Sequence, residues 1–491
     1  MEISKTIDLP QLEVRMLREI LQFLRPSDSR QVWLVGGSIR DLLRGATTVP
    51  DLDLATSFNP ISAARDFARA TGAGFVVLDE ERHVVRLVSE TDCGHYTFDL
   101  SEFRAPTIDE DLRARDFTIN SIAAPLFGSG NTALAEGRID LYDPLNGVEH
   151  LAIGRIEPSS DRLFTDDPLR LMRAFRFSAL FDAEFSPKLH AMVVAQAKLL
   201  KDVSGERIRD EFYKVLGVRN SAKWVRLMDS TGILAVVLPQ LHACHGVEQN
   251  EWHHLDVYEH TLLTLENLEK FLNSDQPYPW WHSFITYLNE TVSGTRTYAQ
   301  NLKLGCLLHD LGKPPCRRYD HEAKRTIFHG HEMEGASMAR DIGENLRLSV
   351  NETHYLQKLV KNHMRPGVML QQGLNDKRLF RFYSETGRDG LGIALMSLAD
   401  RYSALGSLSE DDLAEFTAGI FQIMHQFYEQ MKRPKMQPFL NGNDLIRQLG
   451  LKPGPEFRRI LEALEEAQFT GEIKTRDEAL ALARTLLQPA A

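Results

Sequence analysis

Cysteine is scarce in this sequence, and long hydrophobic runs are absent. The 491 residues include four cysteines, which form no C-x-x-C pair and no spacing typical of a zinc site. We therefore expect neither a disulfide framework nor a zinc finger, but a protein of a reducing compartment. No apolar run is long enough to cross a bilayer, and no charged-then-apolar leader opens the chain. These absences predict a soluble cytoplasmic protein that makes no membrane contact. The cysteines are Cys93, Cys244, Cys306 and Cys316.

An excess of positive charge is also missing. The chain carries 57 Lys and Arg against 68 Asp and Glu, a formal net charge of −11. This balance argues against long, nonspecific tracking along a polyanion. Two regions are locally basic, because residues 151–240 hold 14 basic and 11 acidic residues, and residues 431–491 hold 10 and 8. A local nucleic-acid surface is thus compatible with the composition.

The apolar pattern divides the chain into an α/β part and a helical part. Residues 11–25 have helical periodicity, and from residue 161 onward nearly every segment has a helical pattern. The stretch 273–296, with its prolines and glycine, is expected to be an insertion loop. Short strands are expected at Val32–Val35, Phe75–Leu78, Val84–Val88 and Tyr96–Leu100.

The length is sufficient for three or four domains that each bury a core. We expect a catalytic head at residues 1–150 and a helical neck at 151–240. A larger helical domain at 241–425 and a small helical tail at 426–491 complete the chain.

Two aspartates, Asp51 and Asp53, are the most informative residues of the chain. They stand at positions i and i+2 of a predicted strand, so both side chains face the same side. Oxygen ligands a few ångströms apart suit Mg²⁺, which keeps several waters and shares phosphate oxygens with a substrate.

A glycine-containing turn precedes these aspartates. Gly36 and Gly37 follow a buried strand, and without a Cβ they let a ligand approach the backbone closely. The helix expected over Ser38–Leu43 starts at this turn, so its free amides point to the same place. A phosphate cradle beside a two-carboxylate metal site is the equipment of phosphoryl or nucleotidyl transfer. Either half alone would be no more than a helix cap or an exposed strand end.

Together with two later motifs, this arrangement resembles the polymerase-β-like nucleotidyltransferases. The order of the motifs is that of the bacterial class II tRNA nucleotidyltransferases, the family of CCA-adding enzymes and poly(A) polymerases. The later motifs are Arg115-Asp116-Phe117-Thr118-Ile119-Asn120 and Asp166-Asp167-Pro168-Leu169-Arg170, the second continued by Arg173-Ala174-Phe175-Arg176-Phe177.

The resemblance implies roles for the residues around the first motif. Asp51 and Asp53 are implied to bind Mg²⁺, activate the RNA 3′-hydroxyl and bridge to the triphosphate. Asp99, on a later predicted strand, is a candidate third carboxylate. The triphosphate cradle is implied to consist of Gly36, Gly37 and Ser38, with Arg40 as a charged phosphate partner.

The second motif departs from the family. Ala114 stands where the family usually has an arginine. Which residue of this chain makes the contact of that arginine is left open. Arg115 and Asp116 match the family and are implied to bind the ribose and phosphate side of the nucleotide.

The third motif is implied to read the base. Asp167 and Arg170 stand at i and i+3 at the start of a predicted helix, so both can face one pocket. A carboxylate only accepts and a guanidinium only donates, which fits cytosine and adenine but leaves like groups facing uracil and guanine. An acidic first helical turn before a basic face is the alternative. Arg173 and Arg176 are expected to support the pocket or bind RNA phosphates.

A second metal site is predicted in the third domain. Imidazoles and carboxylates on separate apolar helices are costly to bury alone, so mutual coordination of a metal is expected. Their H…HD…D pattern resembles the HD phosphohydrolase superfamily, and two further histidines resemble ligands of a second metal. Imidazole ligands favour Mn²⁺, Ni²⁺ or Co²⁺ over Mg²⁺; an inactive, structural HD domain is the alternative. The first set is His260, His309, Asp310 and Asp400, and the further ligands are His331 and His363.

These resemblances imply an α+β fold, with a mixed-sheet nucleotidyltransferase head followed by all-helical neck, HD and tail domains. The implied activity is template-independent addition or repair of the tRNA 3′-terminal CCA from CTP and ATP. The HD domain is implied to hydrolyse phosphate-ended RNA or nucleotides. The oligomeric state stays open.

Three alternatives are weighed against this function. An enzyme that adds only the terminal A is not separated from it by the motifs. A poly(A) polymerase is disfavoured, because the loop Gly45–Pro50 lacks basic residues and the tail is nearly neutral. A noncatalytic RNA-binding regulator, a different class of protein, is disfavoured by the intact aspartates of both sites.

Overall fold

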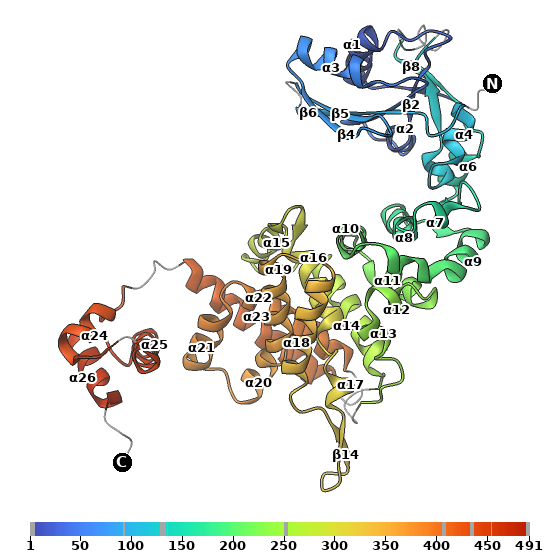
Figure 1. The fold of residues 1–491 in the computed structure, drawn as a ribbon. Helices are drawn as coiled ribbons and strands as arrows, with labels where there is room; N and C mark the ends of the chain where they lie inside the picture. The colour runs from blue at the N-terminus through green and yellow to red at the C-terminus, as the bar shows by residue number, and fades with distance from the viewer. Residues whose placement is uncertain are drawn as a thin grey trace. The chain divides into compact units, whose positions relative to one another are not determined.

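The structure of the protein is a computed structural model, shown in Figure 1. Two compact units make up the chain, the first containing Met1–Val215 and Ser230–Val236 and the second Leu216–Asp229 and Val237–Ala491. Cys244, Cys306 and Cys316 are free thiols, and Cys93 lies outside the described residues. The described residues are 5–91, 94–127, 134, 136–249, 254–404, 409–432, 437–452 and 454–487.

The first unit is built on a six-stranded mixed sheet with the strand order β4-β5-β6-β3-β2-β7. Strands β3 and β6 are parallel, and the other neighbours are antiparallel. The four strands expected from the sequence are all present, which confirms the α/β reading of this region. The strands are β2 (Val32–Val35), β3 (Asp51–Thr56), β4 (Gly74–Asp79), β5 (Val84–Thr91), β6 (Gly94–Glu102) and β7 (Ala123–Pro125).

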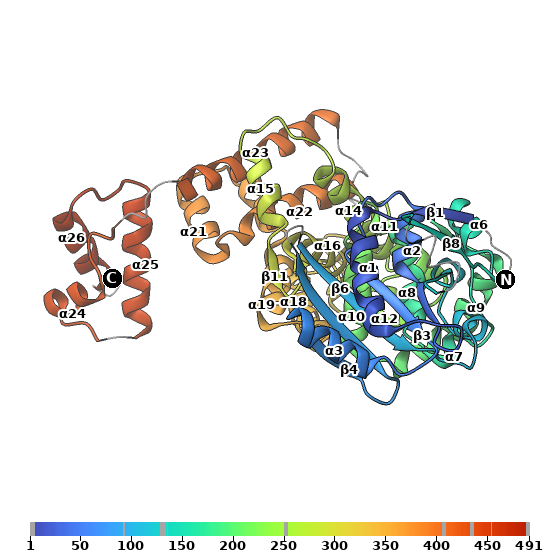
Figure 2. The ribbon, with the colours of Figure 1, turned by 90° about the horizontal axis from the view of Figure 1, so that it is seen from above.

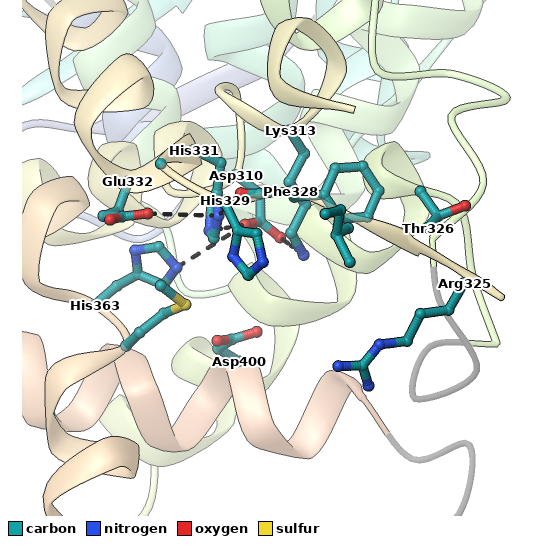
Figure 3. Close-up of a pocket in the computed structure, with 13 residues that line it drawn as sticks. Asp310, Lys313, Arg325, Thr326, Phe328, His329, His331, Glu332, His363 and Asp400 are labelled. Atoms are coloured by element: carbon teal, nitrogen blue, oxygen red, sulfur yellow. Dashed lines mark hydrogen bonds and ion pairs between the residues drawn. The ribbon is translucent and has the colours of Figure 1, made fainter. Parts of the chain in front are cut away.

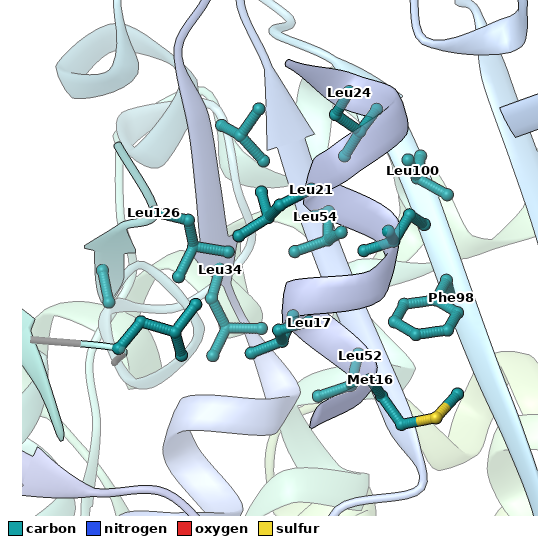
Figure 4. Packing of buried hydrophobic residues seen from close by; sticks show 14 of the residues in the cluster. Met16, Leu17, Leu21, Leu24, Leu34, Leu52, Leu54, Phe98, Leu100 and Leu126 are labelled. Atoms are coloured by element: carbon teal, nitrogen blue, oxygen red, sulfur yellow. The ribbon is translucent and has the colours of Figure 1, made fainter. Parts of the chain in front are cut away.

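Two helices cover one face of this sheet, as Figures 1 and 2 show. Helix α1 (Gln11–Leu24) has apolar residues at helical spacing, and they are buried against the sheet together with residues of α3 (Ile61–Thr71). Figure 4 shows Leu17 and Leu21 of α1 beside Leu34 and Leu54 of the central strands. Because this face is filled by apolar side chains, the polar residues of β3 are left to the other face.

A short strand replaces part of a predicted turn. The segment from Asp140 is expected to be a turn-rich exit, but β8 (Arg138–Leu141) pairs antiparallel with β1 (Lys5–Asp8) before the turn begins. Further elements of the first unit are α2 (Gly37–Leu43), α4 (Ile108–Arg113), η1 (Thr118–Asn120), α6 (Gly147–Ala152), β9 (Arg155–Ile156), α7 (Leu163–Asp166), α8 (Arg170–Phe181), β10 (Glu184–Phe185), α9 (Pro187–Gln196), η2 (Ala197–Asp202) and α10 (Gly205–Leu216).

The prediction that Asp167 lies in the first turn of a helix is wrong. Helix α8 begins at Arg170, and Asp167 has an extended backbone with φ −153° and ψ 103°. The physical reason is Pro168, whose ring disfavours the helical conformation of the preceding residue. Asp167 therefore stands on the link between two helices, while Arg170 stands on the helix itself.

The second unit is predominantly helical, as the sequence predicts. Helix α22 (Asp389–Ser403) is central to it, since the residues from Gly390 to Ala399 are all buried. Its other elements are α11 (Ser221–Ser230), α13 (Pro239–His242), α14 (Val257–Leu272), α15 (Trp281–Leu288), α16 (Tyr298–Leu308), α17 (Lys313–Cys316), α18 (His331–Asn345), α19 (Val350–Asn362), α20 (Arg365–Gln371), α21 (Asp376–Thr386), α23 (Glu410–Lys432), α24 (Gly442–Leu449), α25 (Pro455–Phe469) and α26 (Arg476–Leu487), with hairpins β11 (Thr291–Ser293)–β12 (Arg296–Thr297) and β13 (Arg318–Asp320)–β14 (Arg325–Ile327). Helix α12 (Leu234–Val237) belongs to the first unit except for its last residue.

The prediction of an insertion loop at 273–296 is wrong. This stretch contains α15, and the adjacent Trp280 and Trp281 are buried against Phe421 of α23. Aromatic burial outweighs the turn-forming tendency of the prolines before the helix. Among the described residues, no helix is long and apolar enough to span a membrane.

Candidate active sites

The aspartates of β3 lie on the sheet face opposite α1. The parallel register places Asp53 beside Asp99 of β6, and Asp51 beside Thr97. Burial, with smaller contributions from the nearby Asp99 and Asp51, raises the pKa of Asp53 to about 6, although Arg115 opposes the rise. Three carboxylates at one place repel one another, so a divalent cation would stabilise their charged forms. Their oxygen donors fit Mg²⁺.

The backbone of the Gly36–Gly37 turn lies close to the Asp53 carboxylate. Gly36 has φ +72°, and a Cβ there would lie 3.3 Å from both Asp53 Oδ2 and an Arg115 guanidinium nitrogen. A Cβ on Gly37 would lie 3.6 Å from Asp53 Oδ2. The Ser38 hydroxyl donates to the Asp51 carbonyl at 3.0 Å and accepts from the Asp53 amide at 3.2 Å. Ser38 thus fixes α2 against β3, and only its backbone is free to serve a phosphate.

Two arginines border the same turn. Arg40 donates to Asn120 Oδ1 at 2.6 Å, and its guanidinium lies 3.4 Å from the position that a Cβ on Gly37 would take. Arg115 binds the buried Asp111 through Nε and Nη2, each at 3.0 Å, which leaves its Nη1 beside Gly36. Both guanidinium groups therefore face the carboxylate site with fixed orientation.

The carboxylate of Asp116 is already hydrogen-bonded to protein groups. Its Oδ1 accepts from the Phe117 amide and from Asn120 Nδ2, both at 2.9 Å, and its Oδ2 accepts from Arg173 Nε at 2.8 Å. Although burial opposes it, Arg173 and these hydrogen bonds hold the pKa of Asp116 well below its usual range. Asp116 therefore joins the second motif to α8, and the structure does not direct its carboxylate toward an open site.

The predicted base-reading pair has other partners in this structure. Asp167 lies 3.3 Å from Arg207 through both oxygens, and Arg170 donates to the Ala114 carbonyl at 2.9 Å. Arg176 pairs with Glu211 at 3.2 Å, and burial beside Arg173 lowers its pKa to about 10. The Arg170 amide donates to the Asp167 carbonyl at 3.0 Å, but their side chains bind other groups.

Sequence reasoning missed two ion-pair partners of this site. Arg86 of β5 binds Asp99 with two hydrogen bonds of 2.7 Å each. Arg207 pairs with Asp167; the block Glu206-Arg207-Ile208 resembles a following helix of the family and is expected from the sequence to be structural. The strand alternation of β5 could have placed Arg86 on the carboxylate face, but it could not have paired it with Asp99.

The HD residues meet in a second centre, within the second unit. Ligand atoms of His260, His309 and Asp400 all lie within 4.8 Å of one another. Those of Asp310, His331 and His363 form a second such group. Asp310 Oδ2 lies 3.4 Å from His260 Nε2, and its Oδ1 lies 3.4 Å from His331 Nε2, so this carboxylate faces both groups. All six residues predicted from the sequence are therefore brought together.

The imidazole rings are oriented as metal ligands are. Backbone carbonyls lie 2.7 Å from Nδ1 of His309, 2.9 Å from Nδ1 of His331 and 2.7 Å from Nδ1 of His363. These contacts assign the proton to Nδ1 and leave Nε2 facing the centre. Asp310 Oδ1 is buried and has no hydrogen-bond partner among the described residues, which fits a bound metal.

The titration of these groups also bears on metal binding. Burial lowers the pKa of His363 to about 4, so this ring is a neutral donor. Burial acts in the same direction on His309, but Asp310 and Asp400 outweigh it and raise its pKa to about 10.

The centre opens into a cavity of about 380 Å³, shown in Figure 3. Lys313 and Arg325 provide positive charge on its wall, and Phe328 an aromatic face. Lys313 follows Asp310 by three residues, and its Nζ lies 2.6 Å from Asp310 Oδ2. No role for Lys313 is predicted from the sequence, although it stands three residues after Asp310. The cavity suits an anionic ligand beside the metal ligands.

Comparisons with known proteins follow the same division of the chain. The family model described as "Poly A polymerase head domain" matches residues 32–157, and the one described as "HD domain" matches residues 257–405. The chain is 32% identical to the A-adding tRNA nucleotidyltransferase of Deinococcus radiodurans over 454 residues, covering 91% of this chain and 94% of the relative. The chain belongs to the tRNA nucleotidyltransferase family.

Other relatives in this family differ in their named products. The CC-adding tRNA nucleotidyltransferase of Thermus thermophilus is 29% identical over 94% of each chain. The Thermotoga maritima CCA-adding enzyme complexed with tRNA has the same fold, with a TM-score of 0.62 at 20% identity over 99% of this chain and 100% of that one. The α+β fold class is thereby confirmed, and the chain is a nucleotidyltransferase with an HD domain. Both domains indicate dependence on divalent metals.

Proposed function

We propose that this protein builds or repairs the 3′-terminal CCA of tRNA in the cytoplasm, adding nucleotides from CTP and ATP without a template. The observation that carries the proposal is the carboxylate face of the sheet, where Asp53 and Asp99 lie side by side next to the Gly36–Gly37 turn. We infer the substrate from the family, since the relatives are named as tRNA nucleotidyltransferases.

The head residues divide into metal-binding and phosphate-binding groups. Asp51 and Asp53 would hold Mg²⁺, which when bound would activate the RNA 3′-hydroxyl and neutralise the triphosphate. The backbone of the Gly36–Ser38 turn lies where it can bind phosphate oxygens. Arg40 and Arg115, held by Asn120 and Asp111, point their guanidinium groups to the same place.

The base is read by Asp167 and Arg170 in this proposal. The Asp167 side chain is a third exposed; its Oδ1 accepts from the Leu169 amide at 3.2 Å, and both oxygens lie 3.3 Å from Arg207. We propose that a nucleotide competes with Arg207 for these oxygens. Arg170 uses the Ala114 carbonyl at 2.9 Å as its present acceptor. Arg173 and Arg176 hold the pocket through Asp116 and Glu211.

One assay tests the proposed product. Purified protein is incubated with tRNAs that lack CCA, end in C, or end in CC, with CTP and ATP singly and together. We expect full CCA on the shortest substrate when both nucleotides are present. Addition of A only to the CC-ended tRNA would replace the proposal with terminal A addition, and a stop after CC would replace it with CC addition. Long A tails would indicate a poly(A) polymerase.

We further propose that the HD centre is a phosphohydrolase that acts on phosphate-ended RNA or nucleotides. The support is the set of six ligands around Asp310, together with the cationic wall of Lys313 and Arg325. Imidazole donors favour Mn²⁺, Ni²⁺ or Co²⁺. We propose functional divisions at 1–150, 151–240, 241–425 and 426–491, so that the base-reading neck follows the head and the HD centre lies in the third division.

A further inference from the structure

Two histidines and an aspartate outside both candidate active sites form a third group of ligand atoms. Asp229 lies near the end of α11, His242 is the last residue of α13, and His245 follows one turn later. One ligand atom from each residue lies within 4.8 Å of the others. The proposed head and HD functions use none of these residues.

The carboxylate of Asp229 orients both imidazole rings. Its Oδ1 lies 2.8 Å from Nδ1 of His242, and its Oδ2 lies 2.7 Å from Nε2 of His245. The Asp229 side chain is 14% exposed, whereas those of His242 and His245 are 48% and 40% exposed. The group is therefore anchored from the protein side and open to an ion from solvent.

Neighbouring residues hold these donors in place. The Tyr258 hydroxyl hydrogen bonds to Asp229, and its ring stacks on His245 with the centroids 3.7 Å apart. Arg226, one turn before Asp229, donates to Glu259 at 2.6 Å and to Glu266 at 3.1 Å, which fastens α11 to α14. Hydrogen bonds and packing that fix ligand orientation are typical of metal sites.

We propose that Asp229, His242 and His245 bind one divalent transition-metal ion such as Zn²⁺, Co²⁺ or Ni²⁺. Two imidazoles and one carboxylate suit these ions, whereas Mg²⁺ prefers an all-oxygen environment. Water completes the coordination, because the two histidines face solvent. The ion fastens the segment that follows α13 to α11, and it is independent of the HD centre, with which it shares no ligand.

The test counts the Co²⁺ ions bound per full-length chain, by equilibrium dialysis and elemental analysis. The compared proteins are wild type, the double variant His242→Ala/His245→Ala, and the matched control His190→Ala, whose histidine is exposed on α9. We expect the double variant to bind one ion fewer than wild type and the control to bind the same number. Equal binding by wild type and the double variant would overturn the proposal and leave only a surface ion-pair cluster.

Two further variants keep the result unambiguous. Asp229→Asn keeps the size of the side chain but removes the charge, and it should also bind one ion fewer. Asp310→Ala disrupts the HD centre, and adding His242→Ala/His245→Ala to it should lower the Co²⁺ bound by one further ion, because the two centres share no ligand. Circular dichroism spectra that match wild type establish that each variant is folded. Retention of full Co²⁺ binding by Asp229→Asn would contradict its assignment as a ligand.

Discussion

At the residue scale, the carboxylates of β3 carry the sharpest expectation. Asp53→Asn should lower nucleotide addition by at least 10³-fold, about 4 kcal/mol of transition-state stabilisation, because it removes metal-binding charge while keeping side-chain size. The measurement is a single-turnover assay with radiolabelled ATP on tRNA ending in CC. Asp66→Asn, on the exposed part of α3, is the matched control and should leave the rate unchanged. A near wild-type rate for Asp53→Asn would show that the metal assignment is wrong.

Base selectivity is also decided by single residues. Asp167→Ala and Arg170→Ala should each raise UTP or GTP incorporation relative to CTP and ATP, because each removes one half of the pairing edge. Arg207→Ala should change the rate more than the selectivity, since Arg207 contacts Asp167 rather than the position proposed for the base. Competition assays with mixed nucleotides measure the ratios. Unchanged selectivity with a uniformly lower rate in both alanine variants would assign the pair a structural role.

At the element scale, the position of α8 depends on Asp116. Asp116→Asn should destabilise the first unit by about 3 kcal/mol, because Arg173 loses its buried partner. Asp109→Asn breaks the exposed pair with Arg113 at 2.8 Å and should cost less than about 1 kcal/mol. Urea unfolding followed by circular dichroism measures both. Equal effects of the two variants would contradict the assigned role of Asp116.

The same ion pair predicts a pH dependence. Since the pKa of Asp116 is lower in the folded protein than its ordinary value near 4, its contribution to stability is present above that value. The contribution is lost as the pH falls toward the folded pKa. Wild type should therefore lose more stability than Asp116→Asn between pH 5 and about 3. Parallel losses in the two proteins over this range would argue against the linkage.

At the scale of the whole molecule, the two candidate active sites share no residue and belong to different compact units. Asp310→Ala should abolish phosphoester hydrolysis and spare nucleotide addition. Both reactions are measured on this variant with Mg²⁺, Mn²⁺, Ni²⁺ and Co²⁺, and with a 2′,3′-cyclic phosphate as hydrolysis substrate. No hydrolysis by wild type with any of these ions would reduce the HD domain to a scaffold. Loss of both reactions in a folded variant would mean that the sites are coupled.

The sequence by itself determined the elements and motifs whose causes are local. The strand alternation around Asp51 and Asp53 and the periodicity of α1 were visible, because burial of one face sets a period in the chain. The six HD ligands were visible through the motif's resemblance to the HD superfamily. The sequence also contains the reason why the helix begins only at Arg170, because Pro168 disfavours the helical conformation of Asp167.

The tertiary structure alone decided which side chains meet. The pairs Asp99–Arg86 and Asp167–Arg207, and the group around Asp229, join residues 13 to 40 positions apart. No local pattern encodes such distances, because they follow from strand register and helix packing. For the same reason, the burial of Trp280 and Trp281 against α23 made a helix where the prolines and glycine alone predicted a loop.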